Sequence, residues 1–294
     1  MNKNSSPELN RREFITRAAI GTAGLALAGG IAGCATSKSC CAAEKKTTMK
    51  KIPVGLEMYS VRNECKADFP GTMAAVAKIG YKGVEFAGYW GRSAKEVRQM
   101  LADNGLVTCG THTQFADLQP DKLEATIEFN QIIGNKFVIC PYMTGKTRAD
   151  WLAHAKIFND IAAKLKPLGM WTGYHAHKHD FELIDGESAW DIFFRNTKDE
   201  VIMQLDTSNC VDGGQDPVEV LHRYPGRCRS IHIKSNGGGP EAIIGEDKIN
   251  WAGVFEWCET KGGTKWYVVE HETSKAPLET VKRTYEKLKE LGKV

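Results

Sequence analysis

The stretch Met73-Ala-Ala-Val-Ala-Lys-Ile-Gly80 leads directly into Tyr81-Lys-Gly-Val-Glu-Phe86. Its first half has apolar residues at helical spacing and ends in glycine, as many helices do. Its second half is short and rich in residues that favour strands. The stretch therefore predicts a helix followed by a strand over 82–86, which is the repeating unit of an α/β protein.

The same unit recurs along the chain after residue 52. Alternating strands and helices predict parallel strands with helical crossovers. Eight such units in about 240 residues predict a (β/α)8 TIM barrel that forms a single domain over 52–294. An open doubly wound sheet is the alternative, but the chain lacks its Gly-x-Gly-x-x-Gly fingerprint. The strand-like runs lie near 53–59, 82–86, 106–112, 136–140, 171–177, 201–206, 229–234 and 266–271.

The first fifty residues have a different composition. Asn10-Arg11-Arg12-Glu13-Phe14 precedes a run of small and apolar residues over 18–32, which is the layout of a twin-arginine export signal. The run ends like a lipobox, so we expect a signal peptide over 1–33 and a lipid anchor on Cys34. A plain signal cut at a later small residue is the alternative. Residues 34–51 are small and polar and predict a flexible tether. We therefore expect an exported protein, either periplasmic or a membrane-anchored lipoprotein.

Charge and cysteine spacing argue against nucleic-acid binding and against a structural zinc site. The net charge is +3, too small for a nucleic-acid-binding domain. None of the nine cysteines forms a Cys-x-x-Cys pair, which argues against a structural zinc site. Cys109, Cys140 and Cys228 lie in or beside apolar strand-like runs, so we expect them to be small buried hydrophobes.

Ionisable residues stand where the strand-like runs end, the place where TIM barrels carry their function. The densest group is His175, His177 and His179, which would share one face if the strand continued through them. Buried charges at such ends need a partner or a cation. The sequence thus predicts one divalent metal ion with mixed oxygen and nitrogen ligands, either Mn²⁺, Zn²⁺, Co²⁺ or Fe²⁺. The other strand-end residues are Glu57, Glu85, His112, Asp206, His232, Lys234, Glu270 and Glu272.

Several motifs span the barrel: Gly55-Leu-Glu-Met-Tyr-Ser-Val-Arg62, Gly80-Tyr-Lys-Gly-Val-Glu-Phe86, Gly110-Thr-His-Thr113, Gly173-Tyr-His-Ala-His177, Gln204-Leu-Asp-Thr-Ser-Asn209, Ser230-Ile-His-Ile-Lys234 and Val269-Glu270. With them the chain from about residue 52 resembles the xylose-isomerase-like barrels, the sugar phosphate isomerase/epimerase group. In that family Glu, Asp, His and Glu from the last four strands hold one metal. The resemblance implies Asp206, His232 and Glu270 as ligands. His175 stands where the family has its first glutamate and is expected to bind the metal through a neutral imidazole.

The resemblance implies an isomerase or epimerase that abstracts a proton next to a metal-polarised carbonyl of a sugar or keto-sugar. The alternative is a lyase or hydratase that cleaves 3-keto-glycosides by β-elimination. Export and the His-for-Glu exchange favour this alternative, because the exchange removes one of two proton-passing glutamates. A sugar-binding lipoprotein without catalysis is a third hypothesis. The expected catalytic residues are His177, as base or acid, Glu270 and Lys234. The alternative for Lys234 is a structural ion pair with a neighbouring carboxylate.

The remaining strand-end groups are expected to contact the substrate, a neutral sugar or glycoside. The expected contacts are Glu57, Glu85, His112, His179 and Glu182. Tyr89, Trp90 and Phe115 are candidates for stacking on a sugar ring, with loop packing as the alternative. The glycine-rich stretch 235–240 has no lysine or arginine to bind phosphate and is interpreted as a lid or substrate loop.

Overall fold

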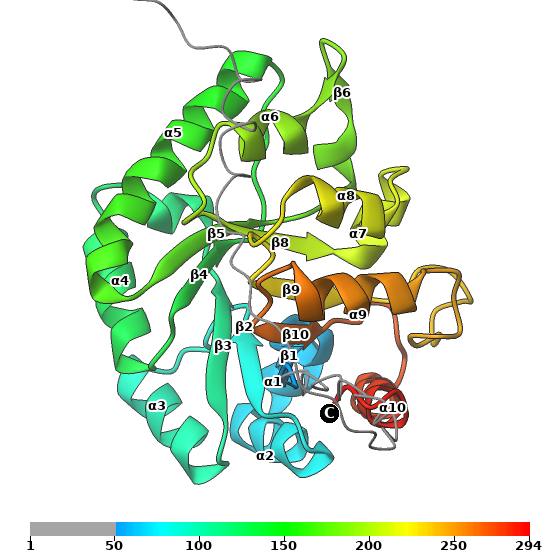
Figure 1. Cartoon of the computed structure of the whole chain (residues 1–294). Helices are drawn as coiled ribbons and strands as arrows, with labels where there is room; N and C mark the ends of the chain where they lie inside the picture. The colour runs from blue at the N-terminus through cyan, green and yellow to red at the C-terminus, as the bar shows by residue number, and fades with distance from the viewer. Residues whose placement is uncertain (1–50) are drawn as a thin grey trace, which may run out of the picture. The chain divides into compact units, whose positions relative to one another are not determined.

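The computed structural model describes residues 51–294. The signal peptide predicted for 1–33 and all but the last residue of the tether predicted for 34–51 lie outside the described residues. The eight predicted strands are all present and close into one parallel barrel in the order β1-β10-β9-β8-β5-β4-β3-β2 (Figure 1). The predicted TIM barrel is thus confirmed. Its strands are β1 Val54–Glu57, β2 Gly83–Phe86, β3 Val107–His112, β4 Phe137–Cys140, β5 Trp171–His175, β8 Ile202–Asp206, β9 Ser230–Ile233 and β10 Trp266–Val269.

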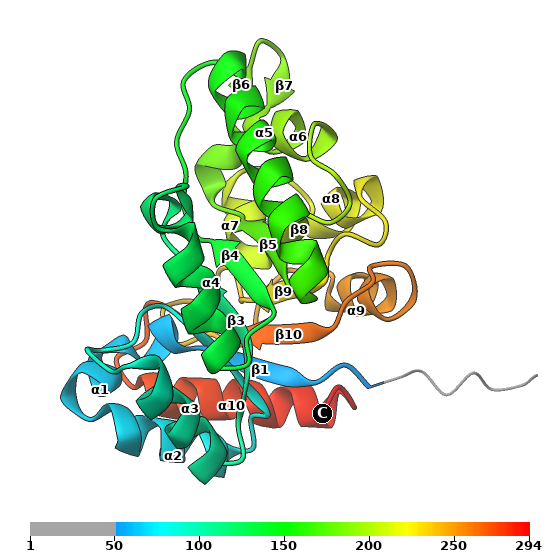
Figure 2. The ribbon, with the colours of Figure 1, turned by 90° about the vertical axis from the view of Figure 1, so that its left-hand side faces the viewer.

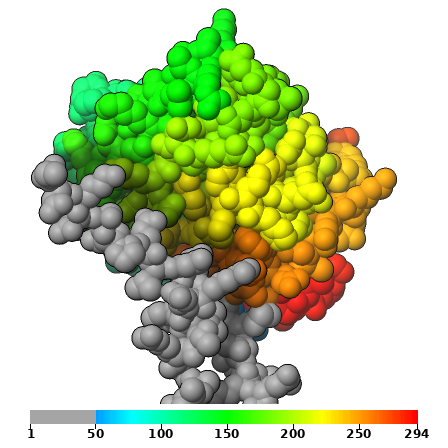
Figure 3. Space-filling model, turned by 45° about the horizontal axis from the view of Figure 1, so that its top comes forward, coloured from blue at the N-terminus to red at the C-terminus, as the bar shows by residue number. Residues whose placement is uncertain are grey.

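Helices surround this barrel (Figure 2). On the face seen in Figure 3, the green-to-yellow segments that include α5 and α8 form a closely packed surface. A short hairpin of β6 Leu183–Ile184 and β7 Glu187–Ser188, which the sequence pattern does not predict, follows β5. No helix among residues 51–294 is long and apolar enough to span a membrane. The helices are α1 Arg62–Ala67, α2 Phe69–Ile79, α3 Ala94–Asp103, α4 Leu123–Ile132, α5 Arg148–Leu165, α6 Ala189–Arg195, α7 Thr207–Asp212, α8 Pro217–Arg223, α9 Trp251–Thr260 and α10 Pro277–Glu290, with 3-10 turns η1 Met58–Val61, η2 Phe115–Leu118, η3 Lys166–Leu168 and η4 Lys178–Phe181.

The junction of α2 and β2 shows why the chain folds into this unit. The Asp68 side chain accepts a hydrogen bond from the backbone of Gly71 and caps the start of α2. The helix ends at Gly80, whose φ of +122° is accessible to glycine and strained for other residues. A side chain at Gly80 would also collide with Tyr285 of α10. The strand then enters the barrel, where every residue of β2 is buried.

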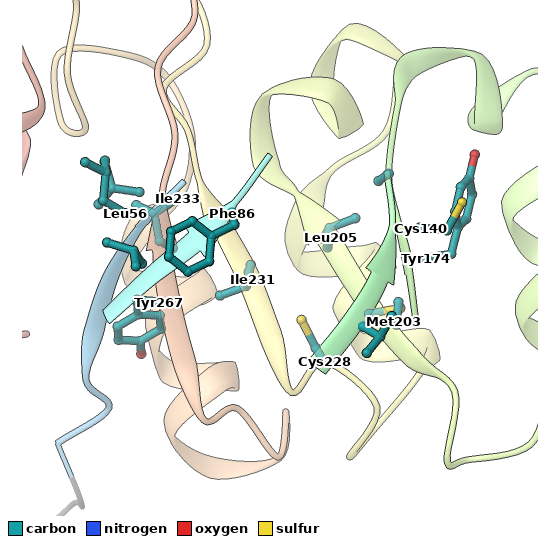
Figure 4. Close-up of a cluster of buried hydrophobic side chains, with 14 of the residues drawn as sticks. Leu56, Phe86, Cys140, Tyr174, Met203, Leu205, Cys228, Ile231, Ile233 and Tyr267 are labelled. Carbon is teal, nitrogen blue, oxygen red and sulfur yellow. The ribbon is translucent and has the colours of Figure 1, made fainter. Parts of the chain in front are cut away.

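Strand alternation separates two apolar cores. Met203 and Leu205 of β8 belong to the large core between barrel and helices, together with Leu56, Tyr174 and Tyr267 (Figure 4). A much smaller cluster contains Phe137, Ile139 and Ile202, with Trp171 and Trp266 packed against it. This second cluster lies on the other face of the strands, inside the barrel. The inward positions further along the strands are polar, and they form the candidate site.

The six cysteines of the described chain are buried and free, including Cys109, Cys140 and Cys228 as predicted. The described chain begins and ends side by side, since Lys51 Nζ donates a hydrogen bond of 2.6 Å to the carbonyl of Val294. Residue 51 leads into the amino-terminal end of β1, so both ends lie away from the strand ends that carry the polar residues.

Candidate active site

Four side chains converge at the carboxyl-terminal ends of adjacent strands. His175 ends β5, Asp206 ends β8, His232 lies on β9 and Glu270 follows β10. Each offers one possible ligand atom, and these atoms lie within 4.8 Å of one another. All four side chains are buried. The structure therefore brings together the four residues that the sequence predicts as metal ligands.

Asp206 has one oxygen that is hydrogen-bonded and one that is not. Its Oδ1 accepts a hydrogen bond of 2.7 Å from the backbone of Asn209 and caps α7. Its Oδ2 is buried and has no hydrogen-bond partner among the described residues. Lys234 Nζ lies 3.5 Å and His175 Nε2 lies 4.0 Å from it. A buried carboxylate oxygen without a hydrogen bond is costly, and a cation at this position would remove that cost.

Gln204 orients His175. It lies two residues before Asp206 on β8, so its side chain shares the inner face of the strand. Its Nε2 donates to both oxygens of Glu85 and to Ser230 Oγ, which leaves its Oε1 as an acceptor. His175 Nδ1 lies 3.0 Å from that oxygen and must carry the proton. The lone pair of His175 is therefore on Nε2, the nitrogen nearer to Asp206.

His232 lies between two carboxylates. Its Nδ1 is 2.7 Å from Glu270 Oε2 and its Nε2 is 2.5 Å from Glu85 Oε2. Burial disfavours a charged imidazole, but hydrogen bonds to Glu270 and Glu85 raise the pKa of His232 well above its usual value. In the absence of a cation, the proton on Nδ1 therefore joins the ring to Glu270.

This donor set fits a divalent cation. Each imidazole keeps an outer hydrogen-bond partner on one nitrogen, Gln204 for His175 and Glu85 for His232, as metal-binding histidines usually do. The other nitrogens and the carboxylates of Asp206 and Glu270 face one another. Two imidazoles with two carboxylates suit Mn²⁺, Zn²⁺, Co²⁺ or Fe²⁺ better than Mg²⁺ or Ca²⁺.

Lys234 adds a positive charge beside this cluster. Its Nζ lies 2.5 Å from Glu272, 3.5 Å from Asp206 and 3.7 Å from Glu270. Burial lowers the pKa of Lys234, but the three carboxylates outweigh it, so the pKa is raised and the side chain is charged. The ion pair that the sequence offered as the alternative role of Lys234 is thus present, and the same ammonium also faces the cluster.

His177 lines the pocket and has one ring nitrogen without a hydrogen bond among residues 51–294. Its Nδ1 is buried without a hydrogen-bond partner among the described residues, and its ring stands edge-on to Tyr142 with centroids 5.2 Å apart. Burial lowers the pKa of His177 to about 4. At neutral pH the ring is therefore uncharged and able to accept a proton.

His179, the third histidine of the triplet, does not share the strand face of His175. The strand ends at His175, and the chain then turns into η4. His179 Nε2 contacts the carbonyl of Met143 at 2.9 Å, and Glu182 is exposed after η4. Neither residue lines the pocket described below, so the geometry gives no support to their predicted contacts with the substrate.

A pocket of about 700 Å³ opens at the barrel mouth. It is lined by four of the predicted site residues, His112, His175, His177 and Glu270. Glu57 and Glu85 are fully buried outside this lining. Glu57 Oε1 accepts a hydrogen bond from the backbone of Tyr59. The lining contains Tyr59, Ala87, Gly88, Tyr89, His112, Thr113, Gln114, Asp117, Lys122, Ala125, Thr126, Phe129, Asn130, Pro141, Tyr142, His175, His177, Glu270 and Glu272.

Of the three predicted stacking residues, Tyr89 alone lines this pocket. Trp90 packs against Phe69 with ring centroids 4.7 Å apart, and Phe115 packs against Phe158 at 6.4 Å. Trp90 and Phe115 therefore pack within the protein, which is the alternative to stacking on a sugar ring. The stretch 235–240 is likewise absent from the lining, and Asn236 Nδ2 ties it to Asp212 at 2.7 Å.

Several pocket and cluster residues were not predicted from the sequence, among them Gln204, Tyr59 and Tyr142. Gln204 was visible as an inward position two residues before Asp206, but its partner Glu85 is distant in sequence. Tyr59 and Tyr142 are 43% and 48% exposed at the pocket wall. No local pattern identifies them, because single exposed aromatic residues are common on protein surfaces.

Comparison with known proteins agrees with this architecture. A family model described as xylose isomerase-like TIM barrel matches residues 73–291. A sugar phosphate isomerase/epimerase from Parabacteroides distasonis superposes with a TM-score of 0.72 at 24% identity, over 84% of this chain and 97% of that one. At this identity the structural likeness shows the fold.

Two proteins named inosose dehydratase are similar in sequence. The protein from Geobacillus kaustophilus is 22% identical over 221 residues, which cover 64% of this chain and 70% of that protein. The protein from Yersinia enterocolitica is 23% identical over 251 residues, which cover 71% of this chain and 84% of that protein.

Proposed function

The chain belongs to the xylose isomerase-like TIM barrel family, and from this premise we propose that it removes a proton from the carbon next to the carbonyl of a sugar or keto-sugar. The proposed cofactor is one divalent metal ion held by His175, Asp206, His232 and Glu270. The observation that supports this proposal is the convergence of these four side chains beside the pocket. Such an ion, when bound, polarises a carbonyl oxygen.

His177 is the proposed base. It lines the pocket, its burial keeps it uncharged, and no described residue hydrogen-bonds to its Nδ1. An uncharged imidazole has a lone pair that can accept a proton, and the burial of His177 makes it a weaker base than a free histidine. Lys234 is the proposed electrophile, because its charged Nζ is held within 4 Å of Asp206 and Glu270 and can donate a hydrogen bond to a developing enolate oxygen.

We favour β-elimination, with release of a group from the carbon beyond the one that loses its proton. This preference rests on His175, because its imidazole is not available to transfer a second proton. Its protonated Nδ1 is bound to Gln204 and its Nε2 faces Asp206, so neither nitrogen can shuttle a substrate proton. The names of the two similar dehydratases fit this chemistry, since a dehydratase eliminates water. A 3-keto-glycoside, which would release its aglycone in this way, is the proposed substrate class.

Epimerisation is the second candidate. It needs two groups that pass protons on opposite faces of the sugar. Glu270 follows β10, His177 follows β5, and both line the pocket. In the absence of a cation, burial raises the pKa of Glu270 to about 7, partly offset by Lys234 and His232.

The product distinguishes these candidates. The protein is treated with a chelator, supplied with Mn²⁺, Zn²⁺ or Co²⁺, and incubated in deuterated water with 3-keto-glycosides and free ketoses. Release of a free aglycone establishes elimination, whereas deuterium in an intact sugar establishes epimerisation. No reaction with any metal, together with sugar binding that a chelator does not change, would refute the enzyme and support a non-catalytic binding protein.

We also propose that the protein is exported by a twin-arginine-type signal and anchored through Cys34. The proposal rests on the sequence of residues 10–34. Replacement of both Arg11 and Arg12 by lysine is expected to leave the protein in the cytoplasmic fraction. Replacement of Cys34 by serine is expected to release an exported protein from the membrane fraction.

A further inference from the structure

The pocket extends beyond the space that one sugar ring needs. Its volume of about 700 Å³ is in the range that holds drug-sized ligands. One part of the lining, with His112, His175, His177 and Glu270, lies at the cluster. The other part comes from the loop after β2, from η2 and from α4.

The part of the pocket lined by the loop after β2, by η2 and by α4 is separated from the proposed metal ligands by the end of β3. Thr111 and His112 are consecutive on β3, so their side chains point to opposite faces. His112 contacts Gln204 inside the barrel at 3.0 Å. Thr111 Oγ1 instead donates to Asn130 of α4 at 3.0 Å. The pocket is lined by both His112 and Asn130, so it reaches from the barrel interior over β3 to the layer of α4.

Two polar side chains of this outer part, Thr126 and Asn130, are already hydrogen-bonded within the protein. Thr126 Oγ1 donates to the carbonyl of Asp117 at 2.8 Å. Asn130 donates to the carbonyl of Thr126 and accepts from Thr111 and Asn135. Thr126 and Asn130 are therefore not free to bind the hydroxyls of a second sugar ring.

Apolar surface remains. Tyr89 and Phe129 are half-buried and lie with ring centroids 4.1 Å apart. Ala87 and Ala125 add small side chains to the lining, and Gly88 leaves it open because no atom lies within 4 Å of the position a Cβ would take. The two rings pack against each other, and together with these small neighbours they form an apolar wall of a slot that suits a planar group. The inner part, in contrast, presents His177, Glu270 and Glu272 to hydroxyls and a carbonyl.

We infer that the slot formed by Ala87, Tyr89, Ala125 and Phe129 is an aglycone subsite, which binds an aromatic group attached to the sugar. The sugar ring would lie at the cluster and the bond to be broken would lie near the end of β3. The inference deepens the proposed function, because it names the class of glycoside that this same site would accept.

Ala125→Trp tests the slot directly. Ala125 is exposed on α4, so an indole there fills the slot without disturbing the core. Gln131→Trp is the matched control, since Gln131 is exposed on the same helix and does not line the pocket. Phenyl and methyl β-glucosides serve as unreactive ligands in calorimetry, and their 3-keto forms serve as substrates.

The wild-type protein should bind the phenyl glucoside at least about tenfold more tightly than the methyl glucoside, the effect of one well-placed apolar group. Ala125→Trp should abolish this preference, and Gln131→Trp should retain it. The 3-keto forms should show the same pattern in kcat/KM. Equal binding of both glucosides by the wild type, or a preference that survives Ala125→Trp, would overturn the subsite. If the phenyl preference is present but no aglycone is released, the subsite stands and elimination fails.

Discussion

Gln204 Oε1 lies 3.0 Å from His175 Nδ1 and so sets which nitrogen of this histidine is free to bind a cation. The same amide donates to both oxygens of Glu85, which in turn contacts His232. One side chain thus supports both histidines of the cluster. This relationship makes the replacement of the family's glutamate by His175 compatible with a metal site, because the imidazole is held in the tautomer that a metal needs.

Gln204→Met should weaken metal binding without removing any proposed ligand. Methionine has a similar length but cannot accept the His175 proton or donate to Glu85. We expect the affinity for Mn²⁺ or Zn²⁺ to fall by about 10- to 100-fold, as for other outer partners of metal ligands. Competition with a chromophoric chelator measures the affinity, and Gln131→Met on the exposed face of α4 is the control. An affinity equal to that of the wild type would show that the amide does not support the site.

His177→Asn should separate catalysis from metal binding. The asparagine retains polarity but cannot act as a base at neutral pH. We expect kcat to fall by about 10²- to 10⁴-fold, the usual contribution of a general base. Metal content should stay at the wild-type level because His177 is not a proposed ligand. If the variant turns over substrate as fast as the wild type, His177 is not the base, and Glu270 becomes the candidate for that role.

The stability of the metal-free protein should depend on pH through His177. Burial lowers its pKa to about 4, whereas an unfolded histidine titrates near 6.5. Between these values the unfolded chain binds more protons, so the stability contribution present above pH 6.5 is lost as the pH falls toward 4. From pH 7 to 5 the wild type should lose at most about 2 kcal/mol relative to His177→Asn. Urea unfolding of both proteins at the two pH values measures the difference, and parallel curves would contradict the assignment.

Arg227 should be a major source of stability away from the site. It is buried, and its guanidinium donates to the carbonyls of Phe194, Lys198 and Val201 at 2.6 to 2.9 Å. Arg227→Leu removes all three of these hydrogen bonds, although Phe194 keeps a donor in Thr197 Oγ1 and Lys198 keeps one in the backbone of Val201, and it should cost about 3 to 5 kcal/mol. Thermal unfolding measures the loss, with the exposed Arg92→Leu as the control. A cost below about 1 kcal/mol would indicate that water replaces the guanidinium.

The barrel could be predicted because each strand and helix has its own local pattern. Gly80 ends α2 where its positive φ favours glycine, and β8 is a short, mostly apolar run with every residue buried, as in a strand that is covered on both faces. The same patterns place the four proposed ligands at strand ends, and the family resemblance selects these four among the strand-end residues. In a barrel the ends of neighbouring strands meet, so Asp206 and His232 had to lie side by side once the strands were identified.

Other features depend on contacts that no local pattern shows. The strand that carries His175 ends there because Asp180 accepts a hydrogen bond from the backbone of His177 and turns the chain into η4. This turn places His179 outside the pocket. The slot over β3 depends on the contact between Tyr89, in the loop after β2, and Phe129 of α4. Their packing follows from the assembled barrel rather than from either segment.

Binding of a divalent ion by the purified chain tests the central proposal most directly. The chelator-treated protein, titrated with Mn²⁺ or Zn²⁺ in a calorimeter, should bind one ion per chain, and His232→Ala and Asp206→Ala should each abolish that binding while circular dichroism shows an intact barrel. A wild-type protein that binds no ion, or variants that bind it as tightly as the wild type, would contradict the account.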